Sequence, residues 1–358
     1  MAEGSAQAPL SLRRLELEGN SVVDAPGSDS LSNVRVAFTY RYDGLPPDNT
    51  FTLPLRYDFH DDSKTVRITG SRLEEGANLP IWATGQIETL PSPNFLALYR
   101  PGMLRAAKTL EEAEKARSQL EGKIRFPLES GYVLLMARDR AEYESLSNRD
   151  APVSAIAQAE TSFEVKPDSI RVLSRQIVVN VQKLFEEGDA DETFRHELAH
   201  LALATLTRPF TPAWVTESAA MYVAGTRPRR VWRQGLRTGR FDKMTFGALT
   251  TKTSLGAADP TGESATYEYA YSAAAAWYLV ETFGAEKYFE FYKSYTDYPA
   301  RDLYARLPGD RIADDSEEVF ATIAAERTPV ALRAIFGLSD ADLDQKVRTW
   351  IRTAGIKA

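Results

Sequence analysis

Alternating apolar and polar positions dominate the first hundred residues. β-Branched and aromatic residues alternate with polar ones over 34–42, 51–59 and 65–71, and a shorter run of this kind spans 95–99. Such alternation predicts strands that are buried on one face. The turn-forming stretches DGLPPDN and HDDSK separate the first three runs, as expected of hairpin connections. We therefore predict a β-rich N-terminal domain over residues 1–102.

Beyond this point the period of the pattern changes. Apolar residues recur at helical spacing over 108–123, and a short apolar run at 131–137 predicts a buried strand. A helix is expected around RAEYESL, and a further strand over 176–184. After that strand, nearly every segment has the helical pattern. Mixed strands and helices followed by helices alone predict an α+β fold for a second domain over 103–358.

Composition narrows the class of protein. The chain has 358 residues, which is long for one core and fits two domains of a soluble globular protein. Its net charge of −7 argues against a general nucleic-acid-binding protein. No run approaches the roughly 20 apolar residues of a membrane span, and the first residues lack the apolar core of a signal peptide. The absence of cysteine excludes disulfides, thiolate metal ligands and cysteine nucleophiles.

Two of the three histidines lie four positions apart in the segment ETFRHELAHLALATL. On a helix, His196 and His200 share one face and can bind one ion from adjacent turns. Glu197 lies one step round the helix, where it can reach a metal-bound water without being a ligand. This H-E-x-x-H pattern is typical of zinc sites. The alternative is a buried helix without metal, but burying these polar side chains without a shared partner is costly.

Sequence signals delimit the histidine helix and a second helix after it. Asp189 can cap the first helix, and a glutamate three residues later can complete a capping-box-like arrangement. Two prolines stop this helix. Thr211 as N-cap, Pro212 at the first helical position and Gly225 at the C-terminal end define the second helix.

The third metal ligand follows from the geometry of these two helices. A metzincin would place a histidine six residues after His200, where Leu206 stands instead. The first helix runs roughly 10 Å beyond His200, and an antiparallel second helix brings Glu217 back by roughly 7 to 8 Å. Glu217 should therefore face His200, although a solvated surface carboxylate is the alternative. Two histidines, one glutamate and an open fourth position make a catalytic rather than a structural zinc site.

The segments HELAH and PAWVTESAAMYVAG resemble the gluzincin metallopeptidases, specifically the bacterial peptidase-MA-like group. The resemblance extends over about 125–355, because 269–295 and 335–351 are similar to that group's C-terminal segments. It implies a Zn²⁺ cofactor, hydrolysis of a peptide or protein substrate, and an extracytoplasmic or membrane-tethered full-length protein. It also implies a tyrosine that stabilises the oxyanion. Tyr271 is the first candidate and Tyr269 the second, and for either one the alternative is an aromatic of the core.

Met221 departs from the pattern of that group. Related proteins often carry a carboxylate four residues after the glutamate ligand, where it orients the first zinc histidine. Loss of such a group typically costs about 10- to 100-fold in metal affinity or activity. Either another group supports His196, or this peptidase is weak. Ser218, in place of the more usual glycine, is a milder change, and the N-terminal strands are distantly similar to an incomplete nuclear-transport-factor-like cone.

Three remaining features have two interpretations each. The basic run 226–240 could line the cleft and hold an acidic group, or be a solvated helix face. The strand predicted over 176–184 could bind an extended substrate at a sheet edge, or be a core strand. His60 is interpreted as a turn histidine, although nearby aspartates make a second cation site conceivable.

These residues together predict a zinc peptidase. His196, His200 and Glu217 hold the metal, Glu197 acts as general base, and zinc with a tyrosine hydroxyl stabilises the oxyanion. The rival hypothesis is a non-catalytic binding or scaffold protein that retains its zinc for stability. Met221 favours this rival, and the intact Glu197 opposes it because a structural zinc has no use for a base.

Overall fold

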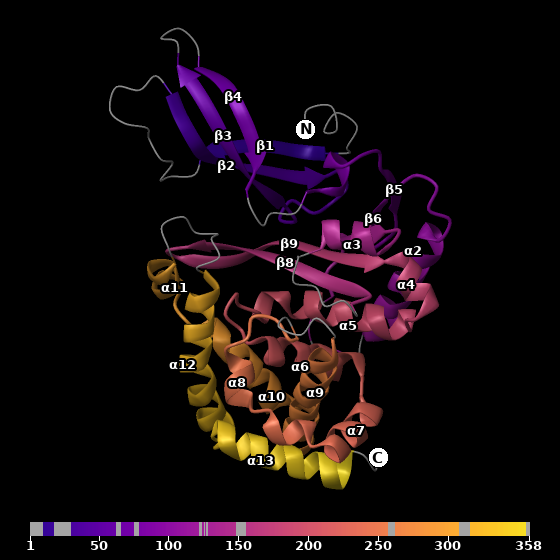
Figure 1. The fold of residues 1–358 in the computed structure, drawn as a ribbon, viewed down its shortest axis with the longest axis vertical. Coiled ribbons are helices and arrows are strands. Elements are labelled where there is room, and N and C mark those ends of the chain that lie inside the picture. Colours follow the sequence, from indigo (N-terminus) through magenta and orange to yellow (C-terminus); the bar gives the residue numbers. More distant parts are fainter. Residues whose placement is uncertain are drawn as a thin grey trace.

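The computed structural model has the mixed α+β composition that the sequence predicts (Figure 1). It describes residues 10–17, 30–61, 66–74, 79–121, 124, 126, 128–147, 155–256, 262–307 and 316–355. Two sheets form the N-terminal half, and helices follow to the C-terminal end. Among the helices in the described ranges, none has the length and apolar character needed to cross a membrane.

The first sheet is an antiparallel meander of four strands in chain order. Its strands are β1 (Leu10–Leu17), β2 (Ser30–Tyr42), β3 (Phe51–Asp61) and β4 (Val66–Leu73). The strands predicted at 34–42 and 51–59 are therefore confirmed, as is the one at 65–71 from residue 66 onward, since residue 65 lies outside the described residues. Tyr40 lies opposite Phe51 in the β2–β3 register, and their stacked rings, 5.5 Å apart, belong to the buried face of this sheet.

The second sheet has five strands in the order β5-β6-β7-β9-β8. Their bounds are β5 (Glu88–Pro91), β6 (Phe95–Tyr99), β7 (Tyr132–Ala137), β8 (Ala157–Lys166) and β9 (Ser169–Asn180). The pairs β6–β7 and β7–β9 are parallel, whereas β5–β6 and β8–β9 are antiparallel. This order makes β8 an edge strand and places β7 in the centre of the sheet.

One sequence prediction about this sheet needs correction, and one open alternative is decided. The strand predicted over 176–184 ends at Asn180, because the Asn180 side chain accepts a hydrogen bond from Lys183 N (3.0 Å) and starts the short helix α4 (Val181–Glu186). That strand is also an interior strand, so the core-strand alternative is correct. Strand β8 is an edge strand of this sheet, which the hydrophobic pattern did not reveal.

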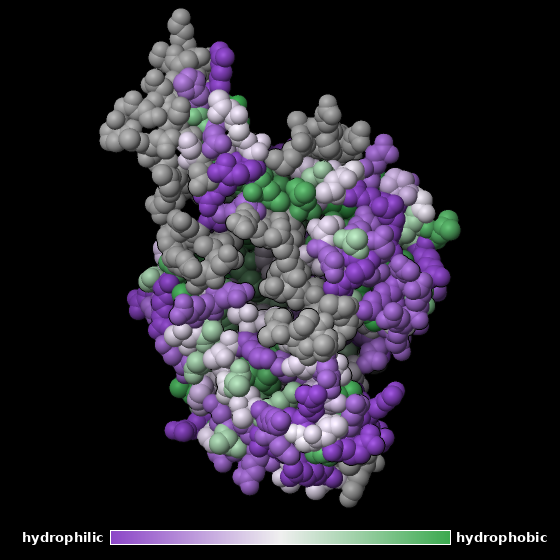
Figure 2. Space-filling view, viewed as in Figure 1, coloured by the Kyte–Doolittle hydropathy of each residue, from purple (hydrophilic) through white to green (hydrophobic). Residues whose placement is uncertain are grey.

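The boundary predicted near residue 102 falls after β5 and β6, which pair within the second sheet. The two sheets therefore divide the chain between Leu73 and Glu88. They also share a core, in which Tyr42 and Leu53 of the first sheet pack with Val133 of the second. Figure 2 shows a mostly hydrophilic face, on which apolar side chains gather near the region where the two sheets meet.

Helices cover the other face of the second sheet. Helix α2 (Ala106–Leu120) and helix α5 (Ala190–Leu203) pack there with α4, while α3 (Arg140–Leu146) lies on the side of the first sheet. The remaining helices are α6 (Ala213–Ala224), α7 (Arg229–Thr238), α8 (Phe246–Thr250), α9 (Glu263–Phe283), α10 (Ala285–Lys293), α11 (Ala300–Arg306), α12 (Ser316–Phe336) and α13 (Asp340–Trp350). Helix α9 lies at the centre of this helical layer (Figure 1). Its four buried alanines, residues 273–276, let neighbouring helices approach closely.

Candidate metal centre

Helix α5 presents the histidines because its opposite face is anchored on the sheet. Phe194, Leu198 and Leu201 pack into the core under the second sheet, so residues 196 and 200 face away from it. Asp189 caps the helix as predicted, accepting a hydrogen bond from Glu192 N (3.0 Å). The reciprocal half of the predicted capping box is replaced by a longer-range contact, since the Glu192 carboxylate accepts from Thr226 Oγ1 (2.7 Å).

Helix α6 begins one residue later than predicted. Pro212 occupies the N-cap position, and Thr211 instead closes the preceding turn by accepting a hydrogen bond from Arg208 N (3.0 Å). Pro212 has the extended ψ of 141° that an N-cap residue adopts, and no side chain caps this helix. Gly225 ends the helix in the left-handed conformation at φ +80°, as the prediction of a C-terminal glycine requires.

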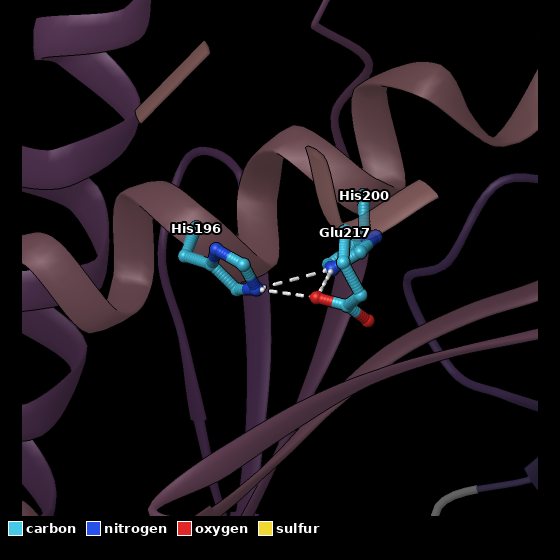
Figure 3. Close-up of side chains that lie close together, drawn as sticks. All are labelled: His196, His200 and Glu217. Atoms are coloured by element: carbon cyan, nitrogen blue, oxygen red, sulfur yellow. Dashed lines mark hydrogen bonds and ion pairs between the residues drawn. The ribbon is translucent and has the colours of Figure 1, made fainter. Parts of the chain in front are cut away.

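Three side chains converge between α5 and α6 (Figure 3). His196 Nε2 lies 3.1 Å from Glu217 Oε2 and 3.2 Å from His200 Nε2, and His200 Nε2 lies 3.3 Å from Glu217 Oε2. Zinc bonds of 2.0–2.1 Å at tetrahedral angles place neighbouring donor atoms about 3.3 Å apart. The three donors therefore have the spacing of three corners of a zinc tetrahedron, and the donor set fits this metal.

The charges within this group are strongly coupled. Although burial alone would favour its neutral form, the hydrogen bonds and charges of His196 and His200 hold the pKa of Glu217 well below its usual range. Burial works against protonation of His196, but the hydrogen bond to Glu217 and the nearby charge of Glu197 raise its pKa to about 9. Without a metal, the site therefore holds a carboxylate against a protonated imidazole.

Glu197 lies beside this group and outside it. The residue is 7% exposed, and its Oε2 accepts a hydrogen bond from Ala159 N of strand β8 (2.6 Å). The Ala159 N–H therefore points away from β9 and out of the sheet edge. Because backbone groups on one side of a strand recur every two residues, the neighbouring edge positions 157 and 161 face the same way.

The group formed by His196, His200 and Glu217 lies in the wall of a cleft of about 520 Å³. Strand β8 forms one side, the ends of α5 and α6 form another, and the loop residues Thr253, Ser254 and Leu255 contribute a third. The buried carboxylate of Glu268 holds this loop, accepting from Lys252 Nζ (2.5 Å) and Gly256 N (2.9 Å). Neither the edge strand nor this loop was identified from the sequence, since backbone groups and long-range loop contacts have no residue signature.

The two candidate tyrosines lie on different sides of α9. Tyr271 is buried in the helical core, where its hydroxyl donates to Asp344 Oδ1 (3.1 Å) and its ring stacks on Phe246. It is therefore not in the site, contrary to its rank as first candidate. Tyr269 lines the cleft. Residues two apart on a helix point about 200° apart, so only one of the pair can face the metal group.

Burial and the charges of Glu217 and Glu197 raise the pKa of Tyr269 well above its ordinary value. The Tyr269 phenol therefore stays protonated and can donate a hydrogen bond into the cleft.

Met221 is buried among apolar side chains of the helical core, one turn after Glu217 on the same helix. The Ser218 hydroxyl lies 2.7 Å from that of Tyr288 on α10 and so connects α6 to its neighbour.

The remaining sequence features lie outside the site. In the described part of the chain, no residue of the basic run 226–240 lines the cleft. Arg227 instead pairs with Glu281 and stacks over Trp277, and α7 exposes arginines to solvent, so the solvated-face alternative is correct. His60 lies within strand β3 rather than in a turn. One of the aspartates considered with it, Asp62, lies outside the described residues.

The structure thus brings His196, His200, Glu217, Glu197 and Tyr269 together in one cleft, beside the edge strand β8. Such a site can hold a dication, accept a proton and align an extended chain. A search with protein-family models and a search among curated proteins found no match to this chain.

Proposed function

We propose that this chain is a zinc-dependent peptidase of the gluzincin type, which hydrolyses bonds in a peptide or protein substrate. The proposal rests on the tetrahedral spacing of the His196, His200 and Glu217 donors, with a second carboxylate, Glu197, beside them. A structural zinc site normally has four protein ligands and no adjacent base. Three ligands and a carboxylate in an open cleft suit hydrolysis.

The protein side of the mechanism follows from the contacts of Glu197. When bound, Zn²⁺ would lower the pKa of a coordinated water and polarise the substrate carbonyl. Oε2 of Glu197 is held by Ala159 N, whereas Oε1 has no partner among the described residues. Oε1 can therefore accept the proton of the attacking water, and the same carboxyl can then donate it to the leaving amine.

Two further groups would position the substrate. The outward backbone groups of β8 can pair with an extended peptide, as strand addition at a sheet edge requires. The Tyr269 hydroxyl can donate to the oxyanion that develops as the water attacks. Strand β8 and Tyr269 line the same cleft as His196, His200 and Glu217.

The direct test is to measure zinc content and cleavage of a mixed peptide library by the purified chain. We expect one zinc per chain, cleavage that a chelator abolishes, and recovery when zinc is restored. Stoichiometric zinc without any cleavage would reject the peptidase and favour the rival, a non-catalytic binding or scaffold protein. Absence of zinc binding would reject both.

A further inference from the structure

The cleft wall contains an arginine that the proposed mechanism does not use. Arg208 lines the cleft just beyond the end of the histidine helix. Its Nη1 donates to the carbonyl oxygens of Thr207 (3.0 Å) and Thr205 (3.4 Å). Nε is buried without a hydrogen-bond partner. In the described part of the chain, Arg208 makes no ion pair with a carboxylate, and its Nη2 makes no hydrogen bond.

The backbone of Arg208 is held in place from both sides. The Thr207 hydroxyl lies 2.6 Å from that of Tyr292, and Arg208 N donates to Thr211 Oγ1 (3.0 Å). Phe210 is buried against Tyr298, with ring centroids 5.1 Å apart. A side chain that starts from such a fixed backbone and is tethered at Nη1 is preorganised for binding.

The electrostatic balance around Arg208 favours an anion. Burial lowers the pKa of its guanidinium, and the charge of Asp297 only partly opposes this. A guanidinium nevertheless stays charged at neutral pH, so the protein carries the cost of a partly buried, unpaired cation. Among the other residues that line the cleft, Glu197 and Glu217 belong to the metal site, and Glu317 is exposed on α12.

We propose that Arg208 is a specificity-determining residue that binds a carboxylate of the substrate, either an acidic side chain or a free C-terminus. This inference rests on the proposed peptidase function and names its substrate class. Arg208 follows His200 by eight residues, beyond the end of α5 at Leu203 and a short 3-10 turn, and both residues line the same cleft. Because the Arg208 side chain starts from a fixed backbone, the carboxylate that it binds should occupy one fixed position relative to the scissile bond.

The test compares peptides that differ only in glutamate or glutamine at successive positions, each made with a free or an amidated C-terminus. At one position we expect the carboxylate form to be preferred by about 10- to 100-fold in kcat/KM, the range of a charge-assisted hydrogen bond. Arg208→Gln should remove this ratio, and Arg208→Lys should recover part of it. Arg237→Gln, which removes the same charge from an exposed position on α7, should leave the ratio unchanged.

A binding measurement separates failure of this inference from failure of the proposed function. The same peptides are titrated by fluorescence anisotropy against zinc-loaded Glu197→Gln protein, with and without Arg208→Gln. A carboxylate preference that depends on Arg208 in binding would support the inference even if the wild-type chain cleaves nothing. Equal ratios with and without Arg208 would overturn it. The inference would also be overturned if Glu317→Gln raised the carboxylate preference by as much as Arg208→Gln lowers it. Such a result would indicate that the net charge of the cleft, and not a direct contact with Arg208, sets the preference.

Discussion

At the scale of single residues, the candidate metal centre consists of three side chains whose potential donor atoms lie 3.1 to 3.3 Å apart. Each of His196, His200 and Glu217 supplies one donor to the group. Removing one of them leaves two, which hold zinc poorly. We expect His200→Ala and Glu217→Ala to lose zinc in elemental analysis after gel filtration. Full zinc retention in both variants would contradict the ligand assignment.

Glu197→Gln is the matched control for these ligand variants, because it changes a carboxylate in the same cleft that is not a donor. It should keep zinc and the wild-type melting temperature, since an amide oxygen can still accept from Ala159 N. Its peptidase rate should fall by at least about 10²-fold, since general-base catalysis contributes about that much or more. Cleavage by Glu197→Gln at the wild-type rate would exclude the general-base role.

Zinc affinity should depend steeply on pH. The pKa of His196 is about 9 in the metal-free protein, whereas a metal ligand must be neutral, so zinc has to displace a proton below that pH. Apparent affinity should rise about tenfold per pH unit, or roughly a hundredfold from about pH 6 to about pH 8. Competition with a chelator of known proton affinity measures this slope. If the apparent zinc affinity stopped rising above about pH 6.5, the pKa of His196 would have its ordinary value.

A substitution at Met221 tests whether the two candidate metal-binding histidines lack a supporting carboxylate. Residues 217 and 221 share a face of α6, so Met221→Glu can place a carboxylate near His196. We expect tighter zinc binding by about tenfold or more, with a lower melting temperature, because position 221 is only 7% exposed. Met221→Gln keeps the shape without the charge and serves as control. Unchanged zinc affinity in a folded Met221→Glu protein would mean that His196 already has another partner.

At the scale of elements, the ends of α5 and α6 determine where the ligands lie. Gly225 ends α6 at φ +80°, and its nearest neighbour to an added Cβ is the Arg195 guanidinium at 3.8 Å. An added Cβ would therefore meet no steric clash, and the strain of a substitution would come only from the left-handed backbone conformation. We expect Gly225→Ala to cost about 1 kcal/mol in the free energy of unfolding, measured in urea.

Gly247 is the matched control for this effect. It lies inside α8 with an ordinary helical backbone and nothing within 4 Å of an added Cβ. Gly247→Ala should therefore be neutral or stabilising by up to about 1 kcal/mol. Equal destabilisation by both substitutions would show that the left-handed conformation of Gly225 is not the cause.

At the scale of the whole molecule, the two sheets are joined by a polar bridge as well as by a shared apolar core. Asn49 is 3% exposed; its side chain donates to Gly131 O (2.8 Å) and accepts from Arg175 N (3.2 Å). Asn49→Ala would leave Gly131 O and the buried Arg175 N without this hydrogen-bond partner. We expect it to lower the free energy of unfolding by about 2 to 3 kcal/mol.

The unfolding of Asn49→Ala should remain one transition, because the first sheet packs directly on the second. Far-UV circular dichroism and tryptophan fluorescence should therefore give coincident curves. Thr39→Ala, at an exposed pair on the first sheet, is the control and should cost about 0.5 kcal/mol or less. Two separate transitions would show that the sheets unfold independently.

The sequence alone determined the features that depend on neighbours within a turn or two. The strand alternation at 34–42 and 51–59, the cap at Asp189 and the helix end at Gly225 are local, and the structure has each of them. The convergence of Glu217 with the histidines was also predictable, since two short antiparallel helices joined by a short loop leave little freedom.

Only the tertiary structure decided which strands and helix faces meet. Strand β6 has the same alternation as β2, so its pattern could not show that it pairs with β7 rather than with the first sheet. Tyr269 and Tyr271 have the same side chain, and the packing of α9 alone places one in the cleft and the other on Phe246. Periodicity records that a face is buried, whereas its partner is selected by packing between segments far apart in the chain.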